Sequence, residues 1–106
     1  MKIPSKVKIS GFIYEVSQVT NLCRDAGHQG ESTNNDLTIK LEKSLAEPVK
    51  ESTFIHELLE QFNDIYMIKL EHKQIYDLEQ AFYSFIVDNP KVFEKVVKQW
   101  VGYLDQ

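Results

Sequence analysis

The chain has 106 residues, 42% of them hydrophobic and 11% aromatic, a composition typical of one globular domain rather than of a disordered segment. Its formal net charge is −4 and its basic residues form no cluster, which argues against a nucleic-acid-binding surface. Cys23 is the only cysteine and no apolar run approaches the roughly 20 residues of a membrane span, so we expect a soluble protein of a reducing compartment, without disulfides or cysteine-based metal sites.

Residues 1–45 have the alternating pattern of β-strands. In "KVKISGFIYEVSQV" apolar residues alternate on both sides of Ser10-Gly11, where glycine permits a tight turn, and this predicts a hairpin. In "AGHQGESTNNDLTIKLE" two glycines and an Asn-Asn-Asp cluster precede the alternating Leu37, Ile39 and Leu41, which predicts a loop or short strand followed by another strand. We therefore expect a small antiparallel sheet, a hairpin plus one or two further strands.

Residues 46–106 have helical spacing. Pro48 suits the first turn of a helix whose apolar stripe is Ile55, Leu58, Phe62 and Ile65. A second stripe, Ile75, Leu78, Phe82 and Phe85, ends at "DNP", where Asn89 as N-cap and Pro90 open a third helix that carries Val92, Phe93, Val96, Val97, Trp100 and Leu104. We expect the three stripes to pack together. The predicted fold class is α+β in a single domain, 1–106, with the sheet in 1–45 and three α-helices in 46–106.

The boundary between the first two helices decides which residues can meet. The segment "NDIYMIKLEHKQIYD" contains neither glycine nor proline, so local signals do not place a break. In one continuous helix His56 and His72 would lie about 24 Å apart, because a helix rises about 1.5 Å per residue. Any site that uses both histidines therefore requires a turn near residues 67–71.

The segment "FIHELLEQF" carries the candidate chemistry. His56 and Glu60 are four residues apart and therefore neighbours on one helix face, directed away from the predicted core stripe. Zn²⁺ accepts imidazole nitrogen and carboxylate oxygen, and Glu57 beside His56 could serve as a general base, as the glutamate of a His-Glu-x-x-His helix does. We prefer His72, at the start of the second helix, as third ligand, and keep Glu79 on the same face as its substitute.

Ordinary explanations of these residues remain open. His-Glu is a common pair on solvated helix faces, and Glu60 stands where the stronger zinc pattern has histidine. His72 and His28, taken singly, fit surface or capping roles, and Tyr76 and Tyr83 on the His72 face fit packing as well as a pocket. In this alternative the helices simply pack on the sheet.

The order "IPSKVKISGFIYEV", "NDLTIKL", "FIHELLEQF", "LEH" and "VDNP" resembles a group of small phage and prophage proteins of low-GC Gram-positive bacteria. Those proteins look like minimal zincin-like metallopeptidase domains with an N-terminal hairpin and a His-Glu-x-x-Glu or His-Glu-x-x-His helix. The similarity covers nearly the whole chain, and its most specific part is "HELLE" followed by "LEH". It implies His56, Glu60 and His72 as metal ligands and Glu57 as the catalytic-type glutamate.

Two functions are therefore expected as alternatives. The first is a zincin-like, metal-dependent hydrolase of the peptidase type in the bacterial cytoplasm, with Zn²⁺ or else Mn²⁺ as its ion. The second is a catalytically inactive interaction module on the same scaffold that binds an unknown protein or peptide. Glu57 favours the first, because a pure scaffold does not need a glutamate beside His56.

Overall fold

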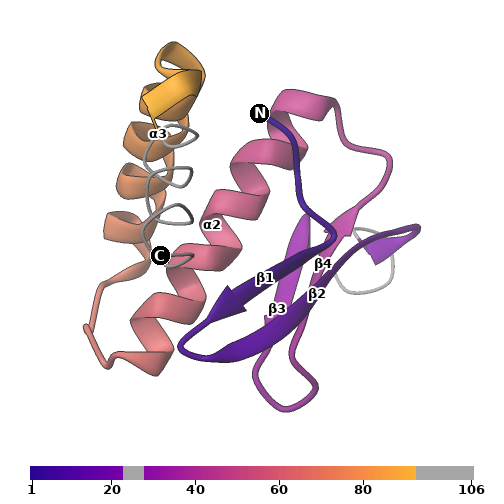
Figure 1. The fold of residues 1–106 in the computed structure, drawn as a ribbon, viewed down its shortest axis with the longest axis vertical. Helices are drawn as coiled ribbons and strands as arrows, with labels where there is room; N and C mark the ends of the chain where they lie inside the picture. The colour runs from indigo at the N-terminus through magenta and orange to yellow at the C-terminus, as the bar shows by residue number, and fades with distance from the viewer. Residues whose placement is uncertain (23–27, 93–106) are drawn as a thin grey trace, which may run out of the picture.

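The computed structural model describes residues 1–22 and 28–92, which form a sheet followed by helices (Figure 1). The strands are β1 (Lys6–Ile9), β2 (Phe12–Val19), β3 (Gly30–Thr33) and β4 (Thr38–Glu42). The long helices are α2 (Glu47–Ile65) and α3 (His72–Asp88). The predicted α+β class is confirmed. In the described part of the chain, no helix is long and apolar enough to cross a membrane.

The predicted hairpin around Ser10-Gly11 is confirmed. Strands β1 and β2 pair antiparallel with Ile9 opposite Phe12, so the loop has two residues. Both loop residues have positive φ angles, +50° at Ser10 and +88° at Gly11, as expected for the turn type whose twist matches that of the strands. Hairpin formation thus follows directly from the local sequence.

The expectation of an antiparallel sheet is wrong, because the sheet is mixed. Its strand order is β1-β2-β4-β3, and β2 pairs with β4 in parallel, Glu15 opposite Thr38. β3 lies at the edge of the sheet and forms an antiparallel hairpin with β4. β3 therefore runs opposite to β2, and β4 then runs in the same direction as β2. Alternation indicates which side chains of a strand share a face, but it carries no information on the direction of the neighbouring strand.

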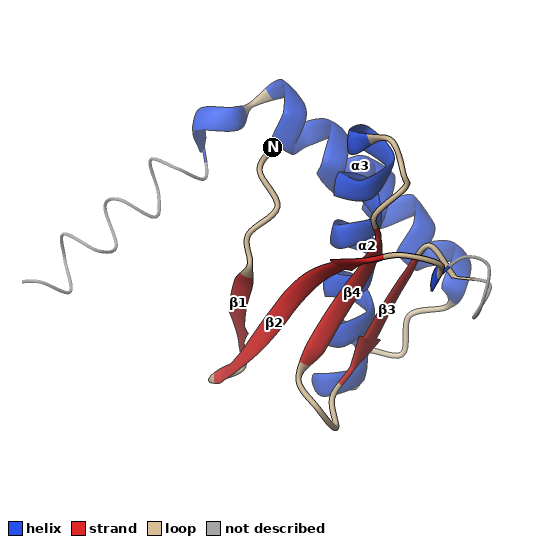
Figure 2. Cartoon of the chain, turned by 90° about the vertical axis from the view of Figure 1, so that its right-hand side faces the viewer, coloured by secondary structure: helices blue, strands red, loops and turns tan. Residues whose placement is uncertain are grey.

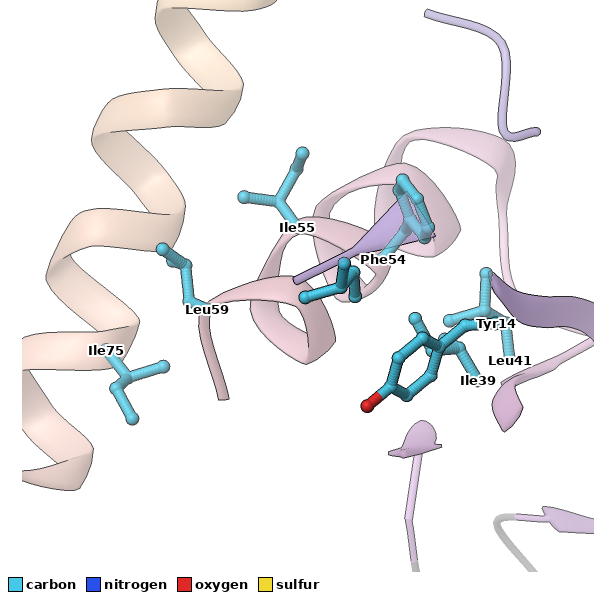
Figure 3. Close-up of a cluster of buried hydrophobic side chains, with 8 residues drawn as sticks. Tyr14, Ile39, Leu41, Phe54, Ile55, Leu59 and Ile75 are labelled. Carbon is cyan, nitrogen blue, oxygen red and sulfur yellow. The ribbon is translucent and has the colours of Figure 1, made fainter. Parts of the chain in front are cut away.

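Helix α2 lies between the sheet and α3, which gives three layers from right to left in Figure 1. Figure 2 shows α2 running behind the strands. Pro48 lies in its first turn, as predicted. The core joins all three layers, and Figure 3 shows most of its buried residues, which are Ile9, Tyr14, Ile39, Leu41, Phe54, Ile55, Leu59 and Ile75. The core therefore fixes α2 on the sheet and the start of α3 on α2.

The predicted packing of the helix stripes is confirmed only in part. Ile55 and Ile75 are buried, and Leu58, Phe62, Ile65 and Leu78 pack against the core. Phe82 and Phe85 are about half exposed, so the predicted burial of the second stripe fails along the later turns of α3. The side of α3 that meets α2 carries Ile75, Glu79 and Tyr83, so Phe82 and Phe85 lie beside this contact rather than in it.

The third helix is described only at its start. Residues 90–92 are helical, in agreement with a start at Pro90. The side-chain amide of Asn89 donates to the Phe85 carbonyl at 3.0 Å, so this side chain completes the end of α3 rather than capping the next helix. The remaining predicted core residues of the third helix, Phe93, Val96, Val97, Trp100 and Leu104, lie outside the described residues.

Candidate functional site

His56 and Glu60 lie on the side of α2 that faces α3. The Nε2 atom of His56 is 3.4 Å from Oε1 of Glu60, as expected for residues four apart in a helix. The His56 side chain is only 13% exposed and that of Glu60 33%, so the expectation that both point away from the packing side is wrong for His56. The pair forms one wall of the contact between the helices.

A turn after α2 brings His72 to this pair, as predicted. Helix α2 ends at Ile65 with Tyr66 as its C-cap, and Met67 and Lys69 have positive φ angles, +49° and +69°. The Asn63 side chain closes the turn, because its Oδ1 accepts from the Leu70 N–H at 2.7 Å and its Nδ2 donates to the Leu70 carbonyl at 3.3 Å. No glycine is needed, which explains why the local sequence did not reveal the break.

His72 is then the first residue of α3 and reaches Glu60. A capping box between Glu71 and Gln74 starts the helix. His72 Nδ1 lies 3.6 Å from Glu60 Oε1, and the His72 side chain is 69% exposed. The rings of His56 and His72 have centroids 5.8 Å apart. The preferred third residue is thus near the pair but largely in solvent.

Glu79, the substitute third residue, contacts His56 more closely. Its Oε1 lies 2.8 Å from His56 Nδ1. Its Oε2 accepts hydrogen bonds from Ser52 Oγ at 2.7 Å and from Gln80 Nε2 at 3.0 Å. Ser52 was missed by the sequence analysis, and the one available signal is that it lies four residues before His56 on the same helix face.

Glu57 points toward the edge strand β3. It is 7% exposed, and its Oε1 accepts a hydrogen bond from Ser32 Oγ at 2.9 Å. Burial raises the pKa of the Glu57 carboxyl above its ordinary value, while the Ser32 hydrogen bond and the nearby His56 oppose that rise. Ser32 was also missed, since nothing in the sequence indicates which strand residue meets α2.

The two tyrosines have different surroundings. Tyr76 lies against both histidines, with ring centroids 4.9 Å from His56 and 4.7 Å from His72. The Tyr83 hydroxyl donates to Glu51 Oε1 at 2.8 Å, a contact elsewhere on α2. Tyr76 belongs to the site and Tyr83 to helix packing.

An open hollow between β3, α2 and the start of α3 connects these groups. Its lining includes the five predicted site residues and three others from separate segments, namely His28, Ser32, His56, Glu57, Glu60, His72, Tyr76 and Glu79. His28, for which the sequence predicts only a loop position, therefore lines the same space. Imidazole and carboxylate side chains, including that of the buried Glu57, thus line one solvent-accessible volume.

The distances allow a comparison with metal coordination. Two ligand atoms about 2.0 Å from a tetrahedral Zn²⁺ are about 3.3 Å apart. The separations from Glu60 Oε1, 3.4 Å to His56 Nε2 and 3.6 Å to His72 Nδ1, are close to this value. Within residues 1–22 and 28–92, however, no group of three or more His, Cys, Asp or Glu side chains is already arranged to hold a metal ion.

The resemblance to phage zincin-like proteins depends on the residues of this chain, chiefly "HELLE" and "LEH", and it stays a prediction. The chain matches no protein-family profile, no curated protein and no solved structure.

Proposed function

We propose that the chain is a zincin-like Zn²⁺-binding protein of phage or prophage origin that hydrolyses peptide bonds in the bacterial cytoplasm. The observation that supports this best is the spacing around Glu60, whose Oε1 lies 3.4 Å from His56 Nε2 and 3.6 Å from His72 Nδ1. Two helices thereby bring a carboxylate and two imidazoles to one hollow, next to the buried Glu57.

His56, Glu60 and His72 would hold the ion in this proposal. His56 and Glu60 are fixed by α2, whereas the exposed His72 side chain has room to rotate toward them. A bound Zn²⁺ supplies Lewis acidity toward a substrate carbonyl. The Glu60 carboxylate brings a negative charge to the metal, whereas the histidine of the more common pattern is neutral. We therefore expect the bound Zn²⁺ to be a weaker Lewis acid and the hydrolysis to be slow. Mn²⁺, which accepts carboxylate oxygen, is the second ion to test.

Glu57 is the group proposed to move the proton. A general base works best when its pKa lies near the working pH, and burial shifts the Glu57 pKa upward, in that direction. The Ser32 hydroxyl holds one carboxylate oxygen from the β3 side at 2.9 Å. The carboxylate also lines the hollow, where it can accept a proton from water.

The proposal is tested by titration calorimetry with Zn²⁺ and Mn²⁺ on protein without a histidine tag. Wild type should bind one ion, His56→Ala and Glu60→Ala should abolish that binding, and His72→Ala should weaken it. Glu57→Gln should keep the ion and lose peptide hydrolysis, because a general base is not a ligand. Asp77→Ala, on an exposed part of α3, is the matched control. A wild type that binds neither ion more tightly than His56→Ala contradicts the proposal.

An interaction module is the second candidate, favoured by the apolar turn between the helices. Tyr66, Met67 and Ile68 are all exposed, with Met67 at 77%. Exposed apolar groups on one turn are typical of a surface that binds another protein. A photo-crosslinking side chain at Met67, compared with one at the exposed Lys43, tests this. Crosslinks to one host or phage protein from Met67 alone, reduced by unlabelled protein, would support the module.

A further inference from the structure

Glu79 has a complete set of hydrogen-bond partners inside the helix contact. Its side chain is largely buried, and Ser52 Oγ and Gln80 Nε2 both approach Oε2, at 2.7 and 3.0 Å. The Gln80 amide nitrogen can only donate, so Oε2 is an acceptor. Oε1 faces His56 Nδ1 at 2.8 Å. The carboxylate is thus already oriented by its neighbours before any ion is considered.

The two ring nitrogens of His56 have unequal partners. Nδ1 lies at hydrogen-bond distance from Glu79, 2.8 Å, whereas Nε2 lies 3.4 Å from Glu60. A neutral imidazole carries one N–H group, and the shorter contact with a carboxylate oxygen selects Nδ1 for it. Nε2 then keeps its lone pair and faces Glu60, on the side where His72 also approaches.

The distance to Glu79 also argues against its role as a ligand. Two atoms that coordinate one Zn²⁺ are about 3.3 Å apart, and the contact between His56 Nδ1 and Glu79 Oε1, at 2.8 Å, is shorter. A hydrogen bond from the second ring nitrogen to a carboxylate is the usual means by which proteins orient a metal-binding histidine.

We propose that Glu79 is a positioning residue that holds the His56 ring by Nδ1–H and directs Nε2 to the metal, which makes His72 rather than Glu79 the third ligand. The Tyr76 ring, 4.9 Å from the His56 ring, restricts the same imidazole from a second side. The inference depends on the proposed metal site for its consequence, but the state of the His56 ring is a property of the metal-free protein.

The first test is nitrogen NMR of the His56 ring in the metal-free protein, at a fixed pH where the imidazole is neutral. Wild type should show Nδ1 protonated and Nε2 bare. Glu79→Ala should shift the ring toward the Nε2–H form that neutral histidine prefers in water, whereas Glu79→Gln keeps a carbonyl acceptor and should preserve Nδ1–H. Asp77→Ala is the control on α3. A wild-type ring protonated at Nε2 overturns the inference.

The second test separates a positioning residue from a ligand. Glu79→Ala should weaken Zn²⁺ binding about 10- to 100-fold with unchanged stoichiometry, the usual effect of losing the group that orients a ligand. The visible absorption spectrum of bound Co²⁺ should keep its shape, because no ligand is lost. A changed spectrum, or a loss as complete as in Glu60→Ala, would identify Glu79 as a ligand and overturn the inference.

One further variant, together with the NMR measurement on the metal-free protein, keeps the outcomes distinct. If Glu79→Ala does not fold, Ser52→Ala removes one of the hydrogen bonds to Glu79 and should produce a smaller change in the same directions, while no change in either the ring or the affinity would count against the inference. If wild type binds no ion, the metal proposal fails, and the NMR result still decides whether Glu79 sets the His56 ring.

Discussion

The two sides of α2 carry polar ladders of the same spacing, shifted by one residue, with different surroundings. The sheet-side ladder is Thr53, Glu57 and Gln61, and the α3-side ladder is Ser52, His56 and Glu60. All members of the sheet-side ladder are buried. Glu60 at the end of the α3-side ladder is 33% exposed and opens to the hollow. The sheet-side ladder is thus held within the packing although its members also line the hollow, whereas the α3-side ladder ends at a partly exposed carboxylate.

The partners of the two glutamates explain the difference. Glu57 accepts a hydrogen bond from the neutral Ser32 hydroxyl, to which Gln61 Nε2 donates at 2.8 Å, so Glu57 and Gln61 are linked through one residue of β3. Glu60 faces two imidazoles across distances longer than a hydrogen bond. The short hydrogen bond from Ser32 holds Glu57 in one orientation at the hollow, whereas the longer contacts of Glu60 leave its carboxylate available to a ligand.

The largest effect is expected where the sheet-side packing is tightest. Ile39 is completely buried in the central strand β4. Ile39→Ala should lower the free energy of unfolding by about 2 to 5 kcal/mol, since it removes methyl groups from a filled core. Urea denaturation measures this, with Ile13→Ala, an exposed isoleucine on β2, as control within about 0.5 kcal/mol of wild type. Equal losses for the two variants would mean that the core lies elsewhere.

The contact between β3 and the sheet-side ladder gives the next effect. A Cβ atom at Gly30 would lie 2.7 Å from Thr53 Cγ2 and 3.1 Å from the Glu57 side chain. Gly30→Ala should therefore cost about 1 to 3 kcal/mol through overpacking. Thr53→Ser removes Cγ2 and keeps the hydroxyl that donates to the Val49 carbonyl.

The double variant Gly30→Ala with Thr53→Ser tests the origin of that cost. It should recover part of the loss caused by Gly30→Ala alone, as measured by urea denaturation of both single variants and the double variant. If the two losses simply add, the strand does not approach α2 at this point, and the packed character of the sheet-side ladder is wrong.

Several features of this arrangement could be predicted from sequence because they are local. The Ser10-Gly11 turn, the place of Pro48 in the first turn of α2 and the adjacency of His56 and Glu60 each depend on a few consecutive residues. The turn before His72 was predicted from the needs of the site, and its stabilising contact by Asn63 is not a recognised turn signal.

The features that were missed depend on contacts between distant segments. Nothing in the sequence states that β2 runs parallel to β4, because alternation is the same in both directions. The hydrogen bond from Ser32 to Glu57 follows from how the layers pack. The same packing places His56 at hydrogen-bond distance from Glu79 rather than from His72. The exposure of Phe82 follows from the same packing, since Tyr83 rather than Phe82 meets α2 at this turn of α3.

The two glutamates should also respond differently to pH. The folded protein raises the Glu57 pKa above its ordinary value of 4.5, because burial penalises the charged carboxylate. The stability associated with Glu57 is therefore fully present below pH 4.5 and is lost as pH rises through the raised pKa. Glu57→Gln, which cannot ionise, should gain stability relative to wild type as pH rises from 4 to about 8.

Urea denaturation of wild type and Glu57→Gln across this pH range measures the difference. The comparison needs only the slope against pH, so a constant cost of fitting the amide beside Ser32 does not affect it. A difference in unfolding free energy that stays flat, or that moves against Glu57→Gln as pH rises, would mean that Glu57 is not penalised by burial.

The smallest effect on stability is expected at Glu60, where the proposed function predicts a large effect on metal binding. Its contacts to His56 and His72 are 3.4 and 3.6 Å long and partly solvated, and such pairs contribute little to the fold. Glu60→Gln should change the unfolding free energy of the metal-free protein by less than about 0.5 kcal/mol. The same variant should lose most Zn²⁺ affinity in calorimetry, because an amide is a poor zinc ligand. A stability loss as large as that of Gly30→Ala would place Glu60 in the packed layer and remove the distinction between the two sides of α2.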